Sequence, residues 1–180
     1  RRNNLVSAHD RFFGRTDELR AMDSHLHDGT RLLCLTGPTG VGKRRLATEF
    51  GARHLDEMSG GAWLADCSQC HDLAGVCATL ARALDIGLTQ PDPVVQIGNA
   101  LLGRSDVIII LADLQTASAS VTQALGTWIS RAPDARFIVT STGPVDLPDA
   151  QILPLDPLPE GTASAMLKAK AGRSIHTPDW

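Results

Sequence analysis

A glycine-rich segment that ends in a lysine carries the clearest chemistry in this sequence. Two glycines separated by four residues and followed by lysine have the spacing of a phosphate-binding loop. Glycines let the backbone turn tightly and aim N–H groups at an anion, and the lysine ammonium adds a point charge. The residues of this loop are Gly37, Pro38, Thr39, Gly40, Val41, Gly42 and Lys43.

The segments on either side of the loop supply the context that this motif requires. The apolar run 31–36 predicts a strand before it, and the spacing of Leu46 and Phe50 predicts a helix from Lys43 to His54. The positive end of that helix dipole would face a bound phosphate. We therefore expect the loop to bind the phosphates of a nucleotide.

The residue after the lysine departs from the usual motif. This position normally holds serine or threonine, whose hydroxyl ligates Mg²⁺, but here it is Arg44. A guanidinium cannot ligate a metal and instead offers five N–H donors. Two interpretations stay open. Arg44 pairs with phosphate oxygens or with Asp113, which predicts nucleotide binding without Mg²⁺, or it blocks the pocket so that no nucleotide binds.

An acidic residue follows the most apolar stretch of the chain. The run Val107–Ala112 predicts a buried strand, and Asp113 comes directly after it. P-loop enzymes use an aspartate at the end of a nearby strand to hold Mg²⁺. An aspartate here could equally cap the following helix. Asp113 is the single candidate for a catalytic role.

Cysteines cluster after the second predicted strand. The segment Cys67–His71 matches the c-type haem attachment pattern, and Cys67, Cys70, His71 and Cys77 could together ligate zinc. Haem attachment requires export, for which we find no signal. We expect neither haem nor zinc here. The preferred interpretation is a polar loop with two partly exposed thiols and a buried Cys77.

Strand and helix patterns alternate along the chain. Strands are expected near 31–36, 62–66, 107–111, 136–140 and 152–155, and helices near 16–28, 43–54, 72–84, 94–102, 116–131 and 160–171. Most of the strands are apolar on both faces, which is typical of a parallel sheet covered by helices on both sides. The fold class is therefore α/β.

Composition excludes several functions. The net charge is −3 with both signs spread along 180 residues, so we expect no direct nucleic-acid binding by this domain. We find no apolar run long enough to cross a membrane and no signal peptide, which favours a cytoplasmic location. The few lysines and the absence of tyrosine suggest a bacterial source.

Several segments in this order resemble the STAND class of signalling ATPases, in particular the NB-ARC-like ATPase domains of bacterial multidomain transcriptional regulators. Phe13–Leu19 is similar to the hydrophobic-Gly-Arg-Glu box that opens the domain, and Leu35–Lys43 with Arg45–Ala47 to its Walker A segment. Further similar segments are Asn3–Leu5, Ala62–Asp66, Arg136–Ser141 and Leu153–Pro159. The resemblance covers about residues 3–172.

The resemblance implies a three-layer ASCE or AAA-like fold whose five-stranded parallel sheet has the order 5-1-4-3-2. It implies a linker at 1–12, a nucleotide-binding domain at 13–172 and the start of a truncated further segment at 173–180. ATP or ADP would act as a switch, with self-oligomerisation and other domains of the same chain as partners. The implied nucleotide-binding residues are Phe13, Gly14, Arg15, Gly37, Pro38, Thr39, Gly40, Val41, Gly42, Lys43, Arg44 and Arg45, the first three near the base and sugar.

Three positions depart from the family pattern. Arg44 replaces the metal-binding threonine, Ala112 the Walker B aspartate, and Thr142 the sensor arginine. These departures predict a regulatory nucleotide-binding domain with weak or absent hydrolysis. Two alternatives stay open: a competent ATPase that uses Asp113 for Mg²⁺ or water, and a scaffold that binds no nucleotide.

Overall fold

A single parallel sheet forms the centre of the molecule. The computed structural model describes residues 3–5, 12–114, 118–143, 147 and 149–171. The strands are β1 Leu32–Thr36, β2 Gly61–Asp66, β3 Val107–Ala112, β4 Ala135–Ser141 and β5 Gln151–Pro154. Their order is β2-β3-β4-β1-β5 and every neighbouring pair is parallel. The predicted order 5-1-4-3-2 is therefore confirmed.

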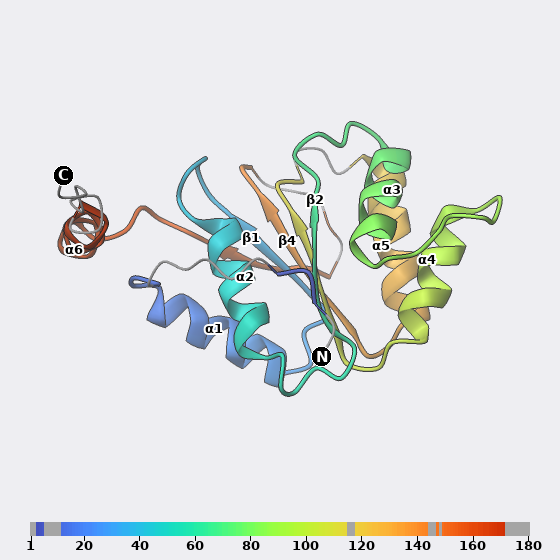
Figure 1. Cartoon of the computed structure of the whole chain (residues 1–180), viewed down its shortest axis with the longest axis horizontal. Helices are drawn as coiled ribbons and strands as arrows, with labels where there is room; N and C mark the ends of the chain where they lie inside the picture. Colours follow the sequence, from blue (N-terminus) through green and yellow to red (C-terminus); the bar gives the residue numbers. More distant parts are fainter. Residues whose placement is uncertain (1–2, 6–11, 115–117, 144–146, 148, 172–180) are drawn as a thin grey trace, which may run out of the picture.

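Helices cover both faces of the sheet (Figure 1). Helices α1 and α2 lie on one face and α3, α4 and α5 on the other. Their bounds are α1 Thr16–His27, α2 Lys43–Arg53, α3 Leu73–Ala83, α4 Pro93–Leu102 and α5 Ala119–Arg131, and α6 Glu160–Ala171 follows the sheet. This is the parallel sheet covered by helices on both sides that the alternating pattern predicts, and it agrees with the three-layer fold that the resemblance implies.

Strand β3, between β2 and β4, shows why the sheet needs two helical layers. All of β3 is buried, and its side chains alternate between the faces. Ile108, Ile110 and Ala112 pack in the cluster under α1 and α2, whereas Ile109 and Leu111 pack in the cluster under α3 to α5. A strand that is apolar on both faces is stable only when both faces are covered.

Side-chain caps begin three of the helices but not α2. Asp72 accepts a hydrogen bond from Gly75 N at the start of α3, as predicted, and Asp92 and Ser118 begin α4 and α5 in the same way. Helix α2 begins after Gly42 with no side-chain cap. Its first backbone N–H groups are the ones that a phosphate could accept from.

The segment before the first helix lies along the edge strand β2. Asn3 pairs with Ala62 in a parallel bridge. The Asn4 side chain donates to Leu64 O at 2.9 Å and accepts from Leu64 N at 2.7 Å. These contacts protect part of an open sheet edge, a site where strands of other molecules could otherwise pair.

The end of the described chain leaves the sheet after β5. The exit segment, residues 155–159, connects β5 to α6. Leu155 N donates to Thr36 O at 2.7 Å, so this segment begins beside the end of β1. Figure 1 shows α6 standing apart from the sheet and from the other helices. Its side chains are exposed or half-buried at positions 160–169, with Leu167 63% exposed.

Candidate functional site

The predicted phosphate loop connects β1 to α2 and needs its glycines. Gly37 has φ 147, and a Cβ built on it would lie 2.5 Å from Leu155 O. Gly42, at the start of α2, has φ 98, in the left-handed region. The close approach of the exit segment and the left-handed turn both exclude ordinary side chains at these two positions.

Lys43 is buried inside this loop. Its side chain donates through Nζ to Gly37 O at 2.8 Å and to Pro38 O at 2.9 Å, and the residue is only 4% exposed. A lysine ammonium has three N–H donors. The contacts with the two loop carbonyls hold the charge where the loop turns into α2.

The first turn of α2 collects positive charge. Lys43, Arg44 and Arg45 are consecutive there, and the turn contains no acidic residue. Each cation faces the positive end of the helix dipole, an arrangement that costs about 0.3–1 kcal/mol per charge at a helix terminus. A bound anion would interact favourably with all three cations and with the helix dipole, and so would offset this cost.

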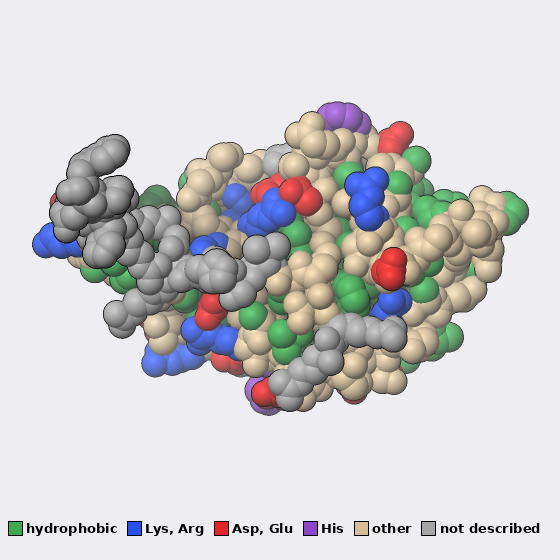
Figure 2. Space-filling view, in the orientation of Figure 1, with side chains coloured by type: hydrophobic (Ala, Val, Ile, Leu, Met, Phe, Trp, Pro, Cys, Tyr) green, Lys and Arg blue, Asp and Glu red, His purple; other side chains and the backbone are tan. Residues whose placement is uncertain are grey.

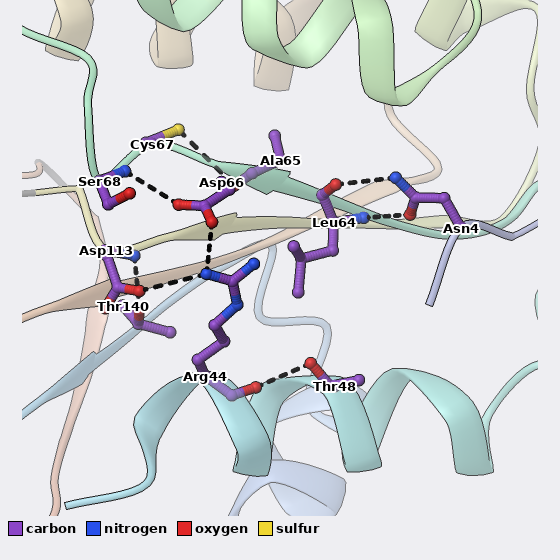
Figure 3. Close-up of polar contacts among 10 residues, drawn as sticks. All are labelled: Asn4, Arg44, Thr48, Leu64, Ala65, Asp66, Cys67, Ser68, Asp113 and Thr140. Atoms are coloured by element: carbon purple, nitrogen blue, oxygen red, sulfur yellow. Dashed lines mark hydrogen bonds and ion pairs between the residues drawn. The ribbon is translucent and has the colours of Figure 1, made fainter. Parts of the chain in front are cut away.

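Arg44 connects α2 to the ends of two strands (Figure 3). Its Nη1 lies 2.6 Å from Asp66 Oδ2 and 3.7 Å from Asp113 Oδ2. The contact with Asp113 was one of the predicted interactions. The shorter contact, with Asp66, was missed, although Asp66 ends β2 as Ala112 ends β3, and parallel neighbours meet at one sheet edge.

Backbone geometry brings Asp113 to the site. Strand alternation would direct it away from α2, because Ala112 already faces that helix. The strand ends at Ala112, however, and Asp113 has φ 58 with its N–H donating to Thr140 Oγ1 at 2.8 Å. Asp113 does not cap the next helix, because Ser118 caps α5.

Asp66 is ionised in this arrangement. Partial burial acts to raise its pKa, but hydrogen bonds from Ser68 and Arg44 outweigh that effect and hold the pKa below its usual value of 3.8. Ser68 N donates to Asp66 Oδ1 at 3.1 Å. A charged carboxylate therefore faces Arg44 at neutral pH.

The donor set here does not suit a Mg²⁺ ion of the kind that P-loop enzymes hold. The residue after the loop lysine carries the Arg44 guanidinium, β3 ends with Ala112, and both nearby carboxylates pair with Arg44. Among the residues that the structure describes, no group of three or more His, Cys, Asp or Glu side chains could hold a metal ion.

Arg15 is a buried residue that connects the phosphate loop to other segments through hydrogen bonds. It is 9% exposed, and it donates to Val41 O at 2.9 Å, to Asp156 O at 2.7 Å and to Glu18 Oε1 at 2.6 Å. Gly14 precedes it with φ 65 and approaches Thr162 of α6 closely. The structure thus places Gly14 and Arg15, from the predicted box Phe13–Leu19, against the phosphate loop and the exit segment. Its contact with base and sugar stays a prediction.

A cleft of about 840 Å³ opens beside the loop. Volumes of this size are typical of small-molecule sites. The cleft joins the loop to the ends of β3 and β4, since its lining includes Thr39, Lys43, Arg44, Arg45, Asp113 and Thr142. Figure 2 shows basic and acidic side chains interspersed on this face, with no broad basic surface among the side chains it colours.

The cysteine segment differs from the prediction at Cys67. This residue is fully buried instead of partly exposed, because Cys67 N donates to Ala112 O at 2.7 Å and keeps the chain beside β3. Burial raises the pKa of its thiol to about 12, and the Cys70 thiol adds to the effect. Cys70 is half-buried and Cys77 is buried, as predicted.

Comparisons with known sequences give distant relatives. No protein-family model matches the sequence. Uncharacterized proteins of Mycobacterium tuberculosis and Mycobacterium bovis are 29% identical over 140 residues, which is 76% of this chain and 34% of theirs. The chain thus spans about one third of the length of these curated relatives.

Solved structures show the same fold in AAA+ P-loop ATPases. Drosophila ORC bound to DNA matches with a TM-score of 0.66 at 15% identity, covering 88% of this chain and 47% of that one. AMPPCP-bound DnaA from Aquifex aeolicus matches at 0.60 and 13%, covering 94% and 56%, and C. elegans PCH-2 at 0.58 and 16%, covering 87% and 46%. Identities this low establish the fold alone.

In the described part of the chain, no helix is long and apolar enough to cross a membrane.

Proposed function

We propose that this chain is a nucleotide-binding domain that takes ATP or ADP as a regulatory switch and hydrolyses ATP weakly or not at all. The start of α2 carries the proposal: an uncapped helix end with three consecutive cations, one of them buried in a glycine loop, opens into a cleft. The neighbour DnaA, which shares this fold, was solved with AMPPCP bound.

Weak hydrolysis follows from the groups beside the loop. Phosphoryl transfer depends on Mg²⁺, on a carboxylate that places the metal or water, and on cations that neutralise the γ-phosphate. Here Arg44 and Ala112 stand at metal-binding positions, and Thr142 stands at the end of β4 where the STAND pattern has arginine. Asp113 is close, but it faces Arg44.

A switch requires a path from the site to other parts of the protein. Arg15 donates hydrogen bonds both to the loop, at Val41 O, and to the exit segment, at Asp156 O. That segment leads directly into α6. We propose that rearrangement of the loop on nucleotide binding is passed along this connection to neighbouring domains of a cytoplasmic STAND-class signalling or transcription-regulating protein, which self-oligomerises.

Thermal denaturation with ATP and with ADP tests the proposal. A ligand that binds only the folded state stabilises by about 2.7 kcal/mol at one hundred times its Kd. We expect both nucleotides to raise the melting temperature of the wild type and neither to raise that of Lys43→Ala. If neither nucleotide raises the melting temperature of the wild type and calorimetry detects no binding to it, the domain is a scaffold and the proposal is wrong.

A competent ATPase is the second candidate, because the Asp113 carboxylate lines the cleft. A phosphate-release assay with Asp113→Ala separates the candidates. Turnover that the wild type shows and the variant loses would favour the ATPase. The regulatory proposal expects both proteins to stay at the background rate.

A further inference from the structure

The position next to the loop lysine holds a fixed cation in place of a metal ligand. We propose that Arg44 takes the place of Mg²⁺, so that the site binds a nucleoside phosphate without a metal. This inference rests on the proposed nucleotide binding and deepens it by naming the form of the ligand.

The first step of the argument is the position of the guanidinium. Arg44 follows Lys43 in the first turn of α2, and its side chain extends toward the carboxyl ends of β2 and β3 (Figure 3). It lines the same cleft as Lys43 and Asp113. The positive charge therefore sits between the loop and the strand ends, the region where P-loop enzymes hold Mg²⁺.

The second step is the balance of charge. In a P-loop enzyme, carboxylate and phosphate charges meet across the metal. Here Asp66 and Asp113 would repel a phosphate if nothing lay between them and the loop. Arg44 contacts both carboxylates through Nη1, at 2.6 Å and 3.7 Å, and so neutralises part of their charge. A nucleotide can then approach without bringing a cation.

The third step is the geometry of the donor. Both ion pairs use Nη1. A guanidinium has five N–H donors in a planar fork, and two of them can bind phosphate oxygens side by side. Arg44 can therefore keep its carboxylate contacts at one end of the fork and bind phosphate with the other. A metal ion at the same place would meet a cation and would find its carboxylate ligands already paired.

Titration calorimetry with ADP, in EDTA and in MgCl₂, tests the inference on the wild type. We expect ADP to bind at least as tightly in EDTA as in MgCl₂, because the site takes the metal-free form. Magnesium should weaken the apparent affinity to the extent that it converts ADP into its Mg²⁺ complex. Binding that is about tenfold or more tighter in MgCl₂ overturns the inference but leaves nucleotide binding intact. No binding in either buffer overturns both.

The variant Arg44→Thr provides the reverse experiment, because it restores the hydroxyl and frees the carboxylates. We expect its affinity for ADP in EDTA to fall by about tenfold or more, and MgCl₂ to restore much of the loss. Arg53→Thr, at the far end of the same helix and outside the cleft lining, is the matched control for a lost charge. Circular dichroism checks that both variants are folded. An Arg44→Thr protein that binds ADP in EDTA like the wild type contradicts the inference.

Discussion

Arg44 Nη1, in the first turn of α2, lies 2.6 Å from Asp66 Oδ2 at the end of β2. Both side chains are about two-fifths exposed, at 42% and 43%. The contact ties the helix that begins at the phosphate loop to a strand three places away from β1 in the sheet, across β4 and β3. It therefore sets the charge beside the loop more than it stabilises the fold.

Removal of the Asp66 charge should strengthen anion binding with little loss of stability. Half-exposed ion pairs contribute about 0–1 kcal/mol, so Asp66→Asn should unfold in urea almost like the wild type. With one negative charge fewer beside Arg44, ADP in EDTA should bind several-fold tighter, roughly threefold to tenfold. Calorimetry measures the affinity. Asp134→Asn, just before β4 at the opposite end of the sheet, should leave it unchanged.

Inorganic pyrophosphate should stabilise the protein through the cationic start of α2. Pyrophosphate is a diphosphate without base or sugar, so it isolates the contribution of the loop. At concentrations well above its Kd we expect a rise in melting temperature of about 4 °C or more, and little change with NaCl at equal ionic strength. Lys43→Ala should lose this response. An equal rise in both proteins would show that the loop is not the site.

Alanine substitutions should separate steric crowding in the loop from backbone strain. At Gly37 an added Cβ would lie 2.5 Å from Leu155 O, whereas at Gly40, with φ 82, it would meet no atom of the described residues within 4 Å. We expect Gly40→Ala to cost about 1 kcal/mol from its left-handed backbone. Gly37→Ala should cost clearly more, about 2–4 kcal/mol, because Leu155 must move. Urea denaturation of the two variants gives the comparison, and equal losses would contradict it.

Thiol labelling should show one accessible cysteine. Only a thiolate reacts rapidly, and Cys67 is buried with its pKa raised to about 12. Cys34 and Cys77 are buried with pKa values raised to about 11, which leaves the half-buried Cys70 to react first. Mass spectrometry after iodoacetamide treatment at pH 8 identifies the site. Cys70→Ser should then show almost no modification until the protein is unfolded.

The three buried thiols, Cys34, Cys67 and Cys77, make the stability of the protein depend on pH with a definite sign. Their pKa values are raised in the folded state, so the unfolded chain releases protons from about pH 9 upward while the folded chain keeps them. This contribution to stability is complete below pH 9 and is lost as the pH rises toward 11–12. Urea midpoints should fall over that range, and Cys67→Ala should reduce the fall relative to the wild type.

Local sequence was sufficient to predict the helices and strands and their order along the chain. The apolar runs and helical spacings gave each strand and helix to within a few residues. The glycine loop located the cleft, because a strand, a GxxxxGK spacing and a helix occur together in one continuous segment. Asp72 was identified as a cap from its place before an apolar periodic stretch.

Positions that depend on distant segments were harder to predict. Cys67 follows a strand in a polar stretch, so its sequence neighbours suggested exposure, whereas a hydrogen bond to Ala112 buries it. Asp113 was expected at a metal, at a helix cap or paired with Arg44, and its sequence neighbours did not choose among these. A left-handed backbone and the Thr140 hydroxyl direct it toward Arg44. Asp66 was missed because its partner is 22 residues away on another element.

The sequence by itself determined the α/β architecture, the phosphate loop and the presence of arginine where a metal-binding hydroxyl is usual, because each of these is written in neighbouring residues. Only the tertiary structure decided which side chains that arginine contacts. Parallel strands bring their carboxyl ends to one edge, so Asp66 and Asp113, far apart in the chain, meet a single guanidinium there. A through-space charge arrangement of this kind depends on sheet order and backbone angles, which no local spacing encodes.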